Sequence, residues 1–295
     1  MKIIKLLLAF SLFALFASIF MFQKLNLNYA EPFFLIGFRM SLAGIILLLH
    51  NYLYTKEFKK LKFSHIKIFL YLGFYNIYLN SIFEIWGLNN MASSKVCLIY
   101  SLSPFITSIL AFFMLKEILT KKKIIGITIG FIGLVPIMYE KNSNNFLNIS
   151  YSELSIILAV LFSVIGWILL KKIINLGYSV ILANGISMLI GGLLILLHSY
   201  IFGENWNMFP VTKWNNFIIL TIVTALISNI ICYNLFGYLL HFFSTTFMTF
   251  AGLITPFFAS ILGFLFLHEN ISHYFFLSLA VFCLGLIIFY QEEIK

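Results

Sequence analysis

Apolar runs of about 20 residues recur along the whole chain and constrain its fold more than any other feature. A helix needs about 20 mostly apolar residues to cross the hydrocarbon core of a bilayer. The longest hydrophilic gap, residues 140–153, is too short for a soluble domain. The pattern therefore predicts an all-α integral membrane protein with ten transmembrane helices. The approximate bounds of the predicted spans are 3–22, 30–50, 66–86, 93–115, 123–139, 152–170, 179–201, 215–239, 244–267 and 273–290.

Composition supports lipid as the solvent of this chain. Hydrophobic residues make up 62% of it and charged residues only 10%, whereas soluble domains carry about 25% charged residues. A net charge of +9 would suggest a nucleic-acid partner in a soluble protein. In a membrane protein, positive charges mark cytoplasmic loops instead. We therefore expect contact with lipid and no nucleic-acid partner.

The distribution of lysine predicts the orientation of the chain. With the N-terminus inside, the cytoplasmic segments hold 14 lysines and the opposite segments hold 4, and Arg39 in the second span completes the total of 19 basic residues. Cytoplasmic loops are the ones enriched in Lys and Arg, so both termini should be cytoplasmic. The first apolar run is longer than the core of a signal peptide, and we expect it to remain as the first helix. We expect the membrane to be the bacterial cytoplasmic (inner) membrane.

One motif occurs twice, at equivalent places in the two halves of the chain. Residues 103–117 are "SPFITSILAFFMLKE" and residues 255–269 are "TPFFASILGFLFLHE", a shift of 152 positions. A second match, with a shift of 148, joins residues 37–52 to residues 185–200. The identical pairs are Pro104/Pro256, Phe105/Phe257, Ser108/Ser260, Ile109/Ile261, Leu110/Leu262, Phe112/Phe264, Leu115/Leu267 and Glu117/Glu269, then Gly37/Gly185, Met40/Met188, Gly44/Gly192, Leu48/Leu196, Leu49/Leu197, His50/His198 and Tyr52/Tyr200.

The repeat predicts two inverted halves. Residues 1–141 and 142–295 would each hold five spans. A unit that crosses the membrane an odd number of times enters it upside down when it is repeated. Inverted repeats of this kind build alternating-access carriers, in which the binding site lies near the bilayer midplane between the halves.

These features together resemble the EamA-like branch of the drug/metabolite transporter superfamily. The resemblance rests on ten spans, the doubled motif with its proline and glutamate, and a glycine-bearing fifth span, "GITIGFIGLV" at 126–135, echoed by "CLGLIIF" at 283–289. It implies transport of a small metabolite such as an amino acid, S-adenosylmethionine or a sugar phosphate, in a cavity lined by helices 3, 4, 8 and 9. This chain departs from strict repetition at Lys116, which pairs with His268, and at Arg39, which pairs with Ser187.

The third span carries the sharpest candidate for a binding site. Asn76, Asn80 and Glu84 are spaced i, i+4, i+8 and so share one helical face. A carboxylate inside a membrane costs about 2.5–3.5 kcal/mol and is expected to face a cavity or a partner. The sequence is compatible with a ligand for a cationic group, with a carboxylate that couples transport to protons, and with a side chain that reaches the headgroups.

Arg39 is the only arginine in the chain and lies about half-way through the second span. A guanidinium there could bind a carboxylate or phosphate of the substrate. It could equally form a structural ion pair, for example with Glu84.

Further polar side chains concentrate in spans 3, 4, 8 and 9. Singly, such residues are more often contacts between helices than ligands. Together with aromatic residues they would form a cavity for a small polar metabolite that has an apolar or aromatic part. The further residues that we predict to bind substrate are Tyr100, Ser228, Asn229, Tyr233 and Thr249.

Two matched pairs are candidates for hinge or gating roles. Pro104 and Pro256 would each interrupt a helical hydrogen bond, which would allow bending or merely be tolerated in packing. Glu117 and Glu269 end their spans, where the helix dipole disfavours a carboxylate. Each then needs a partner, such as the N-terminus of another helix or a basic group across the repeat. A structural or gating role is favoured over contact with substrate.

The sequence favours a secondary transporter over two other functions. The chain contains no Asp, no P-loop and no Cys or His spacing typical of metal ligands, so we expect no metal, no cofactor and no enzymatic activity. A membrane enzyme and a non-transporting scaffold or channel are the alternatives. A coupling proton or exchange substrate is a candidate partner. The glycines Gly126, Gly130 and Gly133 could serve dimerisation or an intramolecular contact.

Overall fold

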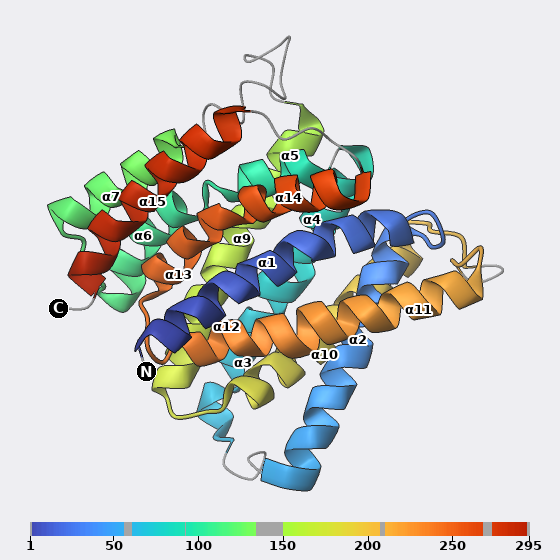
Figure 1. Ribbon diagram of the computed structural model, residues 1–295. Coiled ribbons are helices and arrows are strands. Elements are labelled where there is room, and N and C mark those ends of the chain that lie inside the picture. Colours follow the sequence, from blue (N-terminus) through green and yellow to red (C-terminus); the bar gives the residue numbers. More distant parts are fainter. Residues whose placement is uncertain are drawn as a thin grey trace.

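The computed structural model describes residues 2–55, 61–91, 93–133, 150–206, 210–267 and 273–293. Within these ranges the chain is helical and forms no strand, apart from one isolated bridge between Ala30 and Val211, which confirms the all-α prediction. The helices are α1 Lys2–Asn26, α2 Pro32–His50, α3 Ile66–Leu72, α4 Asn80–Asn90, α5 Ser93–Tyr100, α6 Ser103–Leu115, α7 Lys121–Ile132, α9 Tyr151–Asn175, α10 Val180–Ile201, α11 Trp214–Thr224, α12 Tyr233–Leu239, α13 Thr245–Ala251, α14 Thr255–Leu267 and α15 His273–Glu293 (Figure 1).

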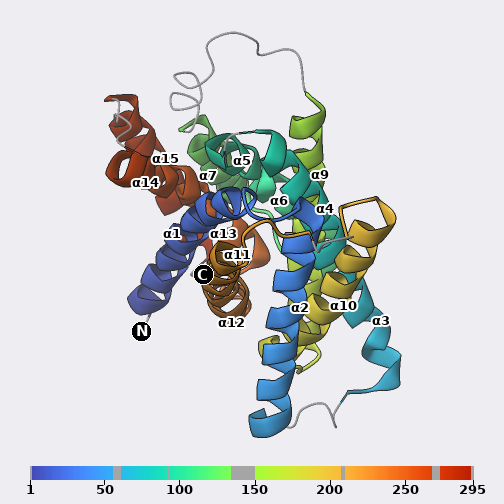
Figure 2. The ribbon, with the colours of Figure 1, turned by 90° about the vertical axis from the view of Figure 1, so that its right-hand side faces the viewer.

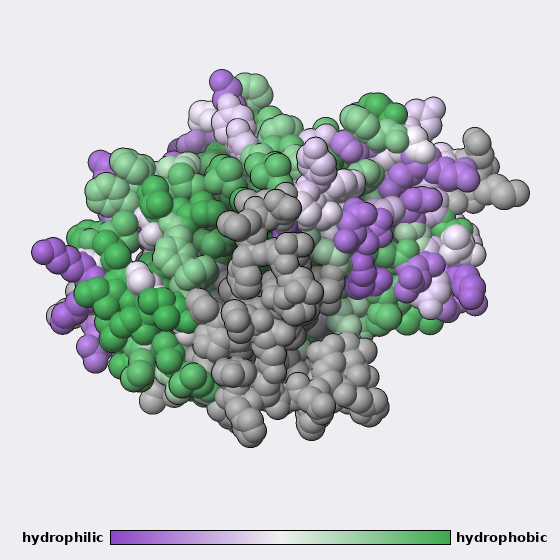
Figure 3. All heavy atoms as spheres, turned by 90° about the horizontal axis from the view of Figure 1, so that it is seen from above, coloured by the Kyte–Doolittle hydropathy of each residue, from purple (hydrophilic) through white to green (hydrophobic). Residues whose placement is uncertain are grey.

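Six continuous helical stretches in the described part of the chain are long and apolar enough to cross a membrane. They are Ile4–Asn26, Pro32–Thr55, Phe63–Asn90, Tyr151–Asn175, Val180–Ile201 and Trp214–Leu239. Shorter apolar helices cover Ser103–Leu115, Thr245–Ala259 and Leu279–Gln291. Figure 3 shows a broad area of hydrophobic side chains on one face, with hydrophilic ones mostly toward its two ends, as expected of a protein surrounded by lipid.

Two of the long stretches contain a π-helical segment at matching positions. One is η4, Gly73–Leu79, between α3 and α4, and the other is η5, Ala225–Cys232, between α11 and α12. Residue 225 follows residue 73 by 152 positions, the same shift that relates the two copies of the motif. Segments of π-helix are uncommon and often lie at functional sites.

The two motif spans are each divided into two helices. A turn at Ser101 and Leu102 separates α5 from α6, and the short 3₁₀ segment η6, Gly252–Ile254, separates α13 from α14. Pro104 and Pro256 therefore lie in the first turn of α6 and of α14, where a missing N–H removes no helical hydrogen bond. The hinge role of these prolines stays a prediction.

Glycines allow two pairs of helices to approach closely. A Cβ atom on Gly44 of α2 would lie 2.4 Å from the backbone nitrogen of Leu189 in α10, and one on Gly285 of α15 would lie 2.5 Å from that of Gly130 in α7. The pairs α2–α10 and α7–α15 lie side by side in both views (Figures 1 and 2). Gly126 and Gly130 thus serve an intramolecular contact. The two termini lie toward the same end of the molecule.

The first turn of α2 is capped by a carboxylate from far along the chain. Glu204, in the loop after α10, accepts hydrogen bonds from the backbone N–H groups of Phe33 at 2.7 Å and Phe34 at 2.8 Å, and from the hydroxyl of Ser199 at 2.5 Å. Burial raises the pKa of Glu204 above its usual value, and these hydrogen bonds oppose that rise. The cap connects the second half of the chain to the first.

Candidate functional site

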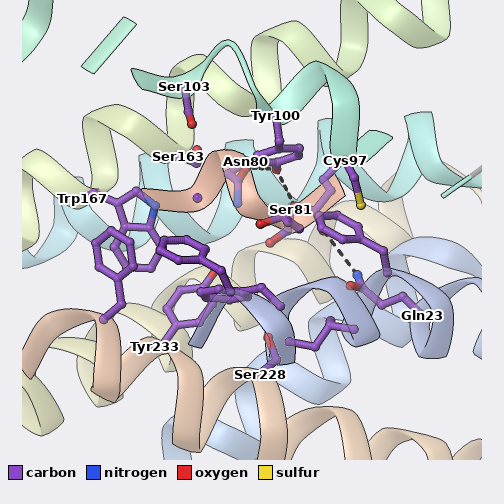
Figure 4. Close-up of a pocket in the computed structure, with 18 of the residues that line it drawn as sticks. Gln23, Asn80, Ser81, Cys97, Tyr100, Ser103, Ser163, Trp167, Ser228 and Tyr233 are labelled. Atoms are coloured by element: carbon purple, nitrogen blue, oxygen red, sulfur yellow. Dashed lines mark hydrogen bonds between the residues drawn. The ribbon is translucent and has the colours of Figure 1, made fainter. Parts of the chain in front are cut away.

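A cavity of about 130 Å³ lies between the two halves of the chain. Helices α1, α2, α4 and α5 line it from the first half, and α9, α12 and α13 with η5 line it from the second. It is large enough to hold several water molecules. Figure 4 shows Trp167 and Ser163 on one side of the cavity and Gln23 and Cys97 on the other.

Glu84 of α4 is the centre of a hydrogen-bonded group at the polar end of the cavity. The hydroxyl of Tyr100 donates to Glu84 Oε2 at 2.5 Å, and Gln23 Nε2 donates to Glu84 Oε1 at 3.4 Å. The Tyr100 hydroxyl also lies 3.1 Å from Asn80 Oδ1. Two of these lines are dashed in Figure 4, where Tyr100 and Gln23 approach from different helices. These contacts fix the carboxylate at the wall of the cavity and exclude the interpretation that it reaches the headgroups.

Arg39 of α2 lines the same cavity as a buried cation. It is 2% exposed, and its Nε and Nη1 atoms have no hydrogen-bond partner among the described residues. It interacts with Glu84 as an opposite charge, without a hydrogen-bonded ion pair in the described part of the chain. Two buried guanidinium nitrogens without hydrogen-bond partners are unfavourable. An anionic group brought against these atoms would supply partners.

Aromatic rings form the other end of the cavity. The rings of Trp167 in α9 and Phe236 in α12 stack with centroids 4.0 Å apart and an interplanar angle of 24°. Tyr233 lies 5.0 Å from Trp167, and Phe16 of α1 packs edge-on against Tyr233 at 6.4 Å. This end can therefore bind a flat apolar or cationic group.

Most of the predicted binding residues come together here. Seven line the cavity: Arg39, Asn80, Glu84, Tyr100, Ser228, Tyr233 and Thr249. Asn76 does not, because it is buried against α9 at Gly166, where an added Cβ would lie 2.2 Å from its own Cβ. Asn229 lies behind the wall, with its amide 2.9 Å from the sulfur of Met40.

The sequence prediction missed the contribution of α1. Phe13, Phe16, Phe20 and Gln23 all line the cavity. Their spacing of three and four residues places them on one helical face, a signal that was present in the sequence. Phe236 was likewise outside the predicted set. One wall of the site therefore comes from the first span.

Glu117 lies outside the cavity and caps another helix. Its carboxylate accepts hydrogen bonds from the backbone N–H of Thr245 at 2.8 Å, and from the N–H and hydroxyl of Thr246 at 3.3 and 2.7 Å. These groups begin α13, where the helix dipole favours a negative charge. Of the two predicted kinds of partner, the structure has the helix N-terminus. Glu269 lies outside the described residues.

Nothing in the described part of the chain is suited to hold a metal. No group of three or more His, Cys, Asp or Glu side chains comes together within those residues. The cavity is lined by one carboxylate, one guanidinium, several hydroxyl groups and a set of aromatic rings. This arrangement can bind a small molecule with separated charged and flat parts.

Comparison with known proteins gives the chain a family context. The model of the EamA-like transporter family matches residues 3–139 and 150–291. A protein of Chlamydia muridarum described as an S-adenosylmethionine/S-adenosylhomocysteine transporter is 35% identical over 289 residues, which are 95% of this chain and 90% of that protein. A transporter of the same description from Chlamydia trachomatis serovar L2 is 33% identical over 95% of this chain and 87% of its own length.

More distant similarities agree with this match. The uncharacterized transporter YoaV of Bacillus subtilis is 22% identical over 90% of this chain. One solved crystal structure shares the fold with a TM-score of 0.77 and 12% sequence identity, covering 98% of this chain and 96% of its own.

Proposed function

The chain belongs to the EamA-like transporter family, and from this premise we propose that it carries S-adenosylmethionine, S-adenosylhomocysteine or a closely similar metabolite by alternating access. It is an integral membrane protein with a small-molecule substrate and is not an enzyme. Two full-length relatives are described as transporters of these two compounds. The scaffold and enzyme alternatives are set aside on this ground.

One observation carries the choice of substrate. Arg39 is buried at the cavity with Nε and Nη1 unpartnered, while Glu84 lies in the same cavity. Both proposed substrates contain an amino-acid end with one carboxylate and one ammonium group. A guanidinium binds a carboxylate through two parallel hydrogen bonds, and Glu84 supplies the negative charge for the ammonium. The substrate would thus complete the hydrogen bonding of Arg39.

We propose that the two halves of the chain are inverted five-helix repeats. Matched contacts at the ends of spans 3 and 8 support this. Lys24 donates to the carbonyl oxygens of Leu88 at 2.6 Å and Asn89 at 2.9 Å, and Lys171 donates to that of Leu240. Leu88 and Leu240 are 152 positions apart. The equal shift of η4 and η5 supports the same conclusion.

The repeats would rock about the cavity between them. Breaks in the helix at residues 101–102 and 252–254 lie beside the cavity, because Tyr100, Ser103, Gly252 and Thr255 all line it. They provide places where spans 4 and 9 can bend. The Glu117 cap on α13 would hold one end closed in this state. We further propose that both termini are cytoplasmic, because lysines concentrate in the segments on the same side of the membrane as the termini. We also propose that the membrane is a bacterial inner membrane.

Transport by the purified protein in lipid vesicles tests this proposal. We expect saturable uptake of labelled S-adenosylmethionine, accelerated by unlabelled S-adenosylhomocysteine inside the vesicles. Arg39→Gln should abolish uptake, and Arg39→Lys should retain part of it, because the ammonium keeps the charge but loses the bidentate geometry. Lys213→Gln, which removes an exposed charge before α11, is the matched control. Uptake that is unaffected by Arg39→Gln, or absent for both compounds, would refute the proposal.

A further inference from the structure

We propose that the aromatic end of the cavity is a subsite for an adenine base, which stacks beside Trp167 and Phe236 and directs its 6-amino group to the hydroxyl oxygens of Ser163 and Thr249. This inference rests on the proposed function, because it assigns the second half of the same substrate. It adds a specificity element that the amino-acid end does not contain.

The stacked pair of rings marks the position of the base. Trp167 and Phe236 lie with centroids 4.0 Å apart, and Tyr233 borders Trp167 at 5.0 Å. All three side chains line the cavity. A base added to an aromatic stack is held by its flat face, and such stacking accepts any base. Stacking therefore explains why a base is bound here, but not which base.

The hydroxyl groups supply the discrimination. Ser163 donates to the carbonyl oxygen of Val160 at 3.0 Å, and Thr249 donates to those of Thr246 at 3.1 Å and Thr245 at 3.2 Å. Each hydroxyl has one hydrogen, and here it is engaged by the helix backbone. Both side chains are buried and line the cavity, so they present lone pairs to it. In this arrangement both oxygens can accept a hydrogen bond from a donor on the ligand.

Adenine matches this set as it stands, whereas hypoxanthine requires both hydroxyls to rotate away from their backbone acceptors. The 6-amino group of adenine donates two hydrogen bonds, whereas the 6-oxo group of hypoxanthine only accepts. Trp167 lines the same cavity (Figure 4), and its indole N–H is a donor for a ring nitrogen. A 6-oxo group would need these hydroxyls to donate to it instead, and they would then lose their hydrogen bonds to the carbonyl oxygens of Val160, Thr245 and Thr246.

The polar end and the aromatic end lie at opposite sides of the cavity, and this arrangement sets the orientation of the ligand. Glu84, Gln23 and Tyr100 form the polar end through their hydrogen bonds, and Figure 4 shows Gln23 and Trp167 at opposite sides of the cavity. A nucleoside joined to an amino acid has its base and its charged end separated by the sugar. It would thus lie across the interface of the two halves with its base toward α9 and α12.

Competition between two ligands that differ only at position 6 tests this subsite. S-adenosylhomocysteine and its deaminated form, S-inosylhomocysteine, compete for uptake of labelled S-adenosylmethionine in vesicles. We expect the adenine compound to compete about tenfold better or more, as for a lost hydrogen bond at a buried site. Ser163→Ala combined with Thr249→Val should reduce this ratio, and Ser163→Thr combined with Thr249→Ser should preserve it.

A binding measurement gives a readout that does not depend on transport. Adenine compounds should quench tryptophan fluorescence in the wild-type protein, and most of this quenching should be lost in Trp167→Phe. Equal competition by both ligands, with saturable uptake intact, would overturn the adenine subsite and leave the proposed function standing. Absence of uptake and of quenching with every adenine compound would overturn both. The comparison of two ligands on the wild-type protein needs no variant to fold.

Discussion

The third and eighth spans share a π-helical segment at the same repeat position, but they bring side chains of different polarity to the cavity. The segment is Gly73–Leu79 in one and Ala225–Cys232 in the other. The side chains of the two spans differ. At a shift of 152 positions, Asn80 aligns with Cys232 and Glu84 aligns with Phe236. One span thus forms the polar end of the cavity and the other its aromatic end. A duplicated backbone with divided side-chain chemistry can bind an asymmetric ligand in one orientation.

Removing the charge of the third span should have the largest effect. Glu84→Gln keeps the shape of the side chain and loses the anion that we assign to the ammonium group of the substrate. We expect kcat/KM for uptake of S-adenosylmethionine to fall about 100-fold, as for loss of one partner of a buried charge pair. Initial rates in vesicles over a range of substrate concentrations measure this.

The control for that variant is Glu31→Gln, at the exposed residue before α2. It removes the same charge outside the cavity and should leave uptake unchanged. Full uptake by a properly inserted Glu84→Gln would move the charged end of the site elsewhere.

Removing the aromatic counterpart in the eighth span should have an intermediate effect. Phe236→Ala deletes the ring that stacks on Trp167, and stacking with a base is worth about 1–3 kcal/mol. We expect KM to rise about tenfold with little change in kcat, because ground state and transported state lose the same contact. Phe112→Ala, at an exposed ring of α6, should leave KM as in the wild type. A change in kcat alone would contradict this assignment.

Two asparagines of the third span have different surroundings, one in the cavity and the other in the packing behind it. Asn80 contacts Tyr100 in the cavity, whereas Asn76 packs against Gly166 of α9. Asn80→Ala should raise KM about threefold to tenfold, the usual effect of one lost hydrogen bond. Asn76→Ala should leave KM unchanged. The same kinetic assay on both variants checks this, and equal KM values would show that the two residues do not differ in this way.

The sequence predicted the all-helical membrane fold and most of the residues that line the cavity, and the reasons are physical. Hydrophobic runs are set by the bilayer, and a carboxylate or guanidinium inside such a run must face a polar interior. Glu84, Arg39 and Asn80 were found by that rule, and they line the cavity. The rule failed for Phe13, Phe16 and Phe20, because an aromatic stripe toward a cavity has the same pattern as one toward lipid.

Other details depended on neighbours that the sequence does not reveal. A proline in an apolar run is compatible with a bent helix or with the start of a new one, and only the turn at residues 101–102 decides for Pro104. Asn76 has the helical spacing of Asn80 and Glu84. However, Gly166 lets α9 pack directly against Asn76, which therefore does not line the cavity. Both cases are decided by tertiary packing rather than by periodicity.

The carboxylate caps also have a consequence for synthesis of the chain. The first turn of α2 is bonded to Glu204, and α2 packs on α10 through Gly44. Leu189 follows Gly44 by 145 positions and Glu204 follows Phe34 by 170, so both partners emerge from the ribosome long after α2 itself. In turn, α13 begins against Glu117, which was made long before it. The N-terminus of the second span therefore acquires its cap only after the seventh span has been made.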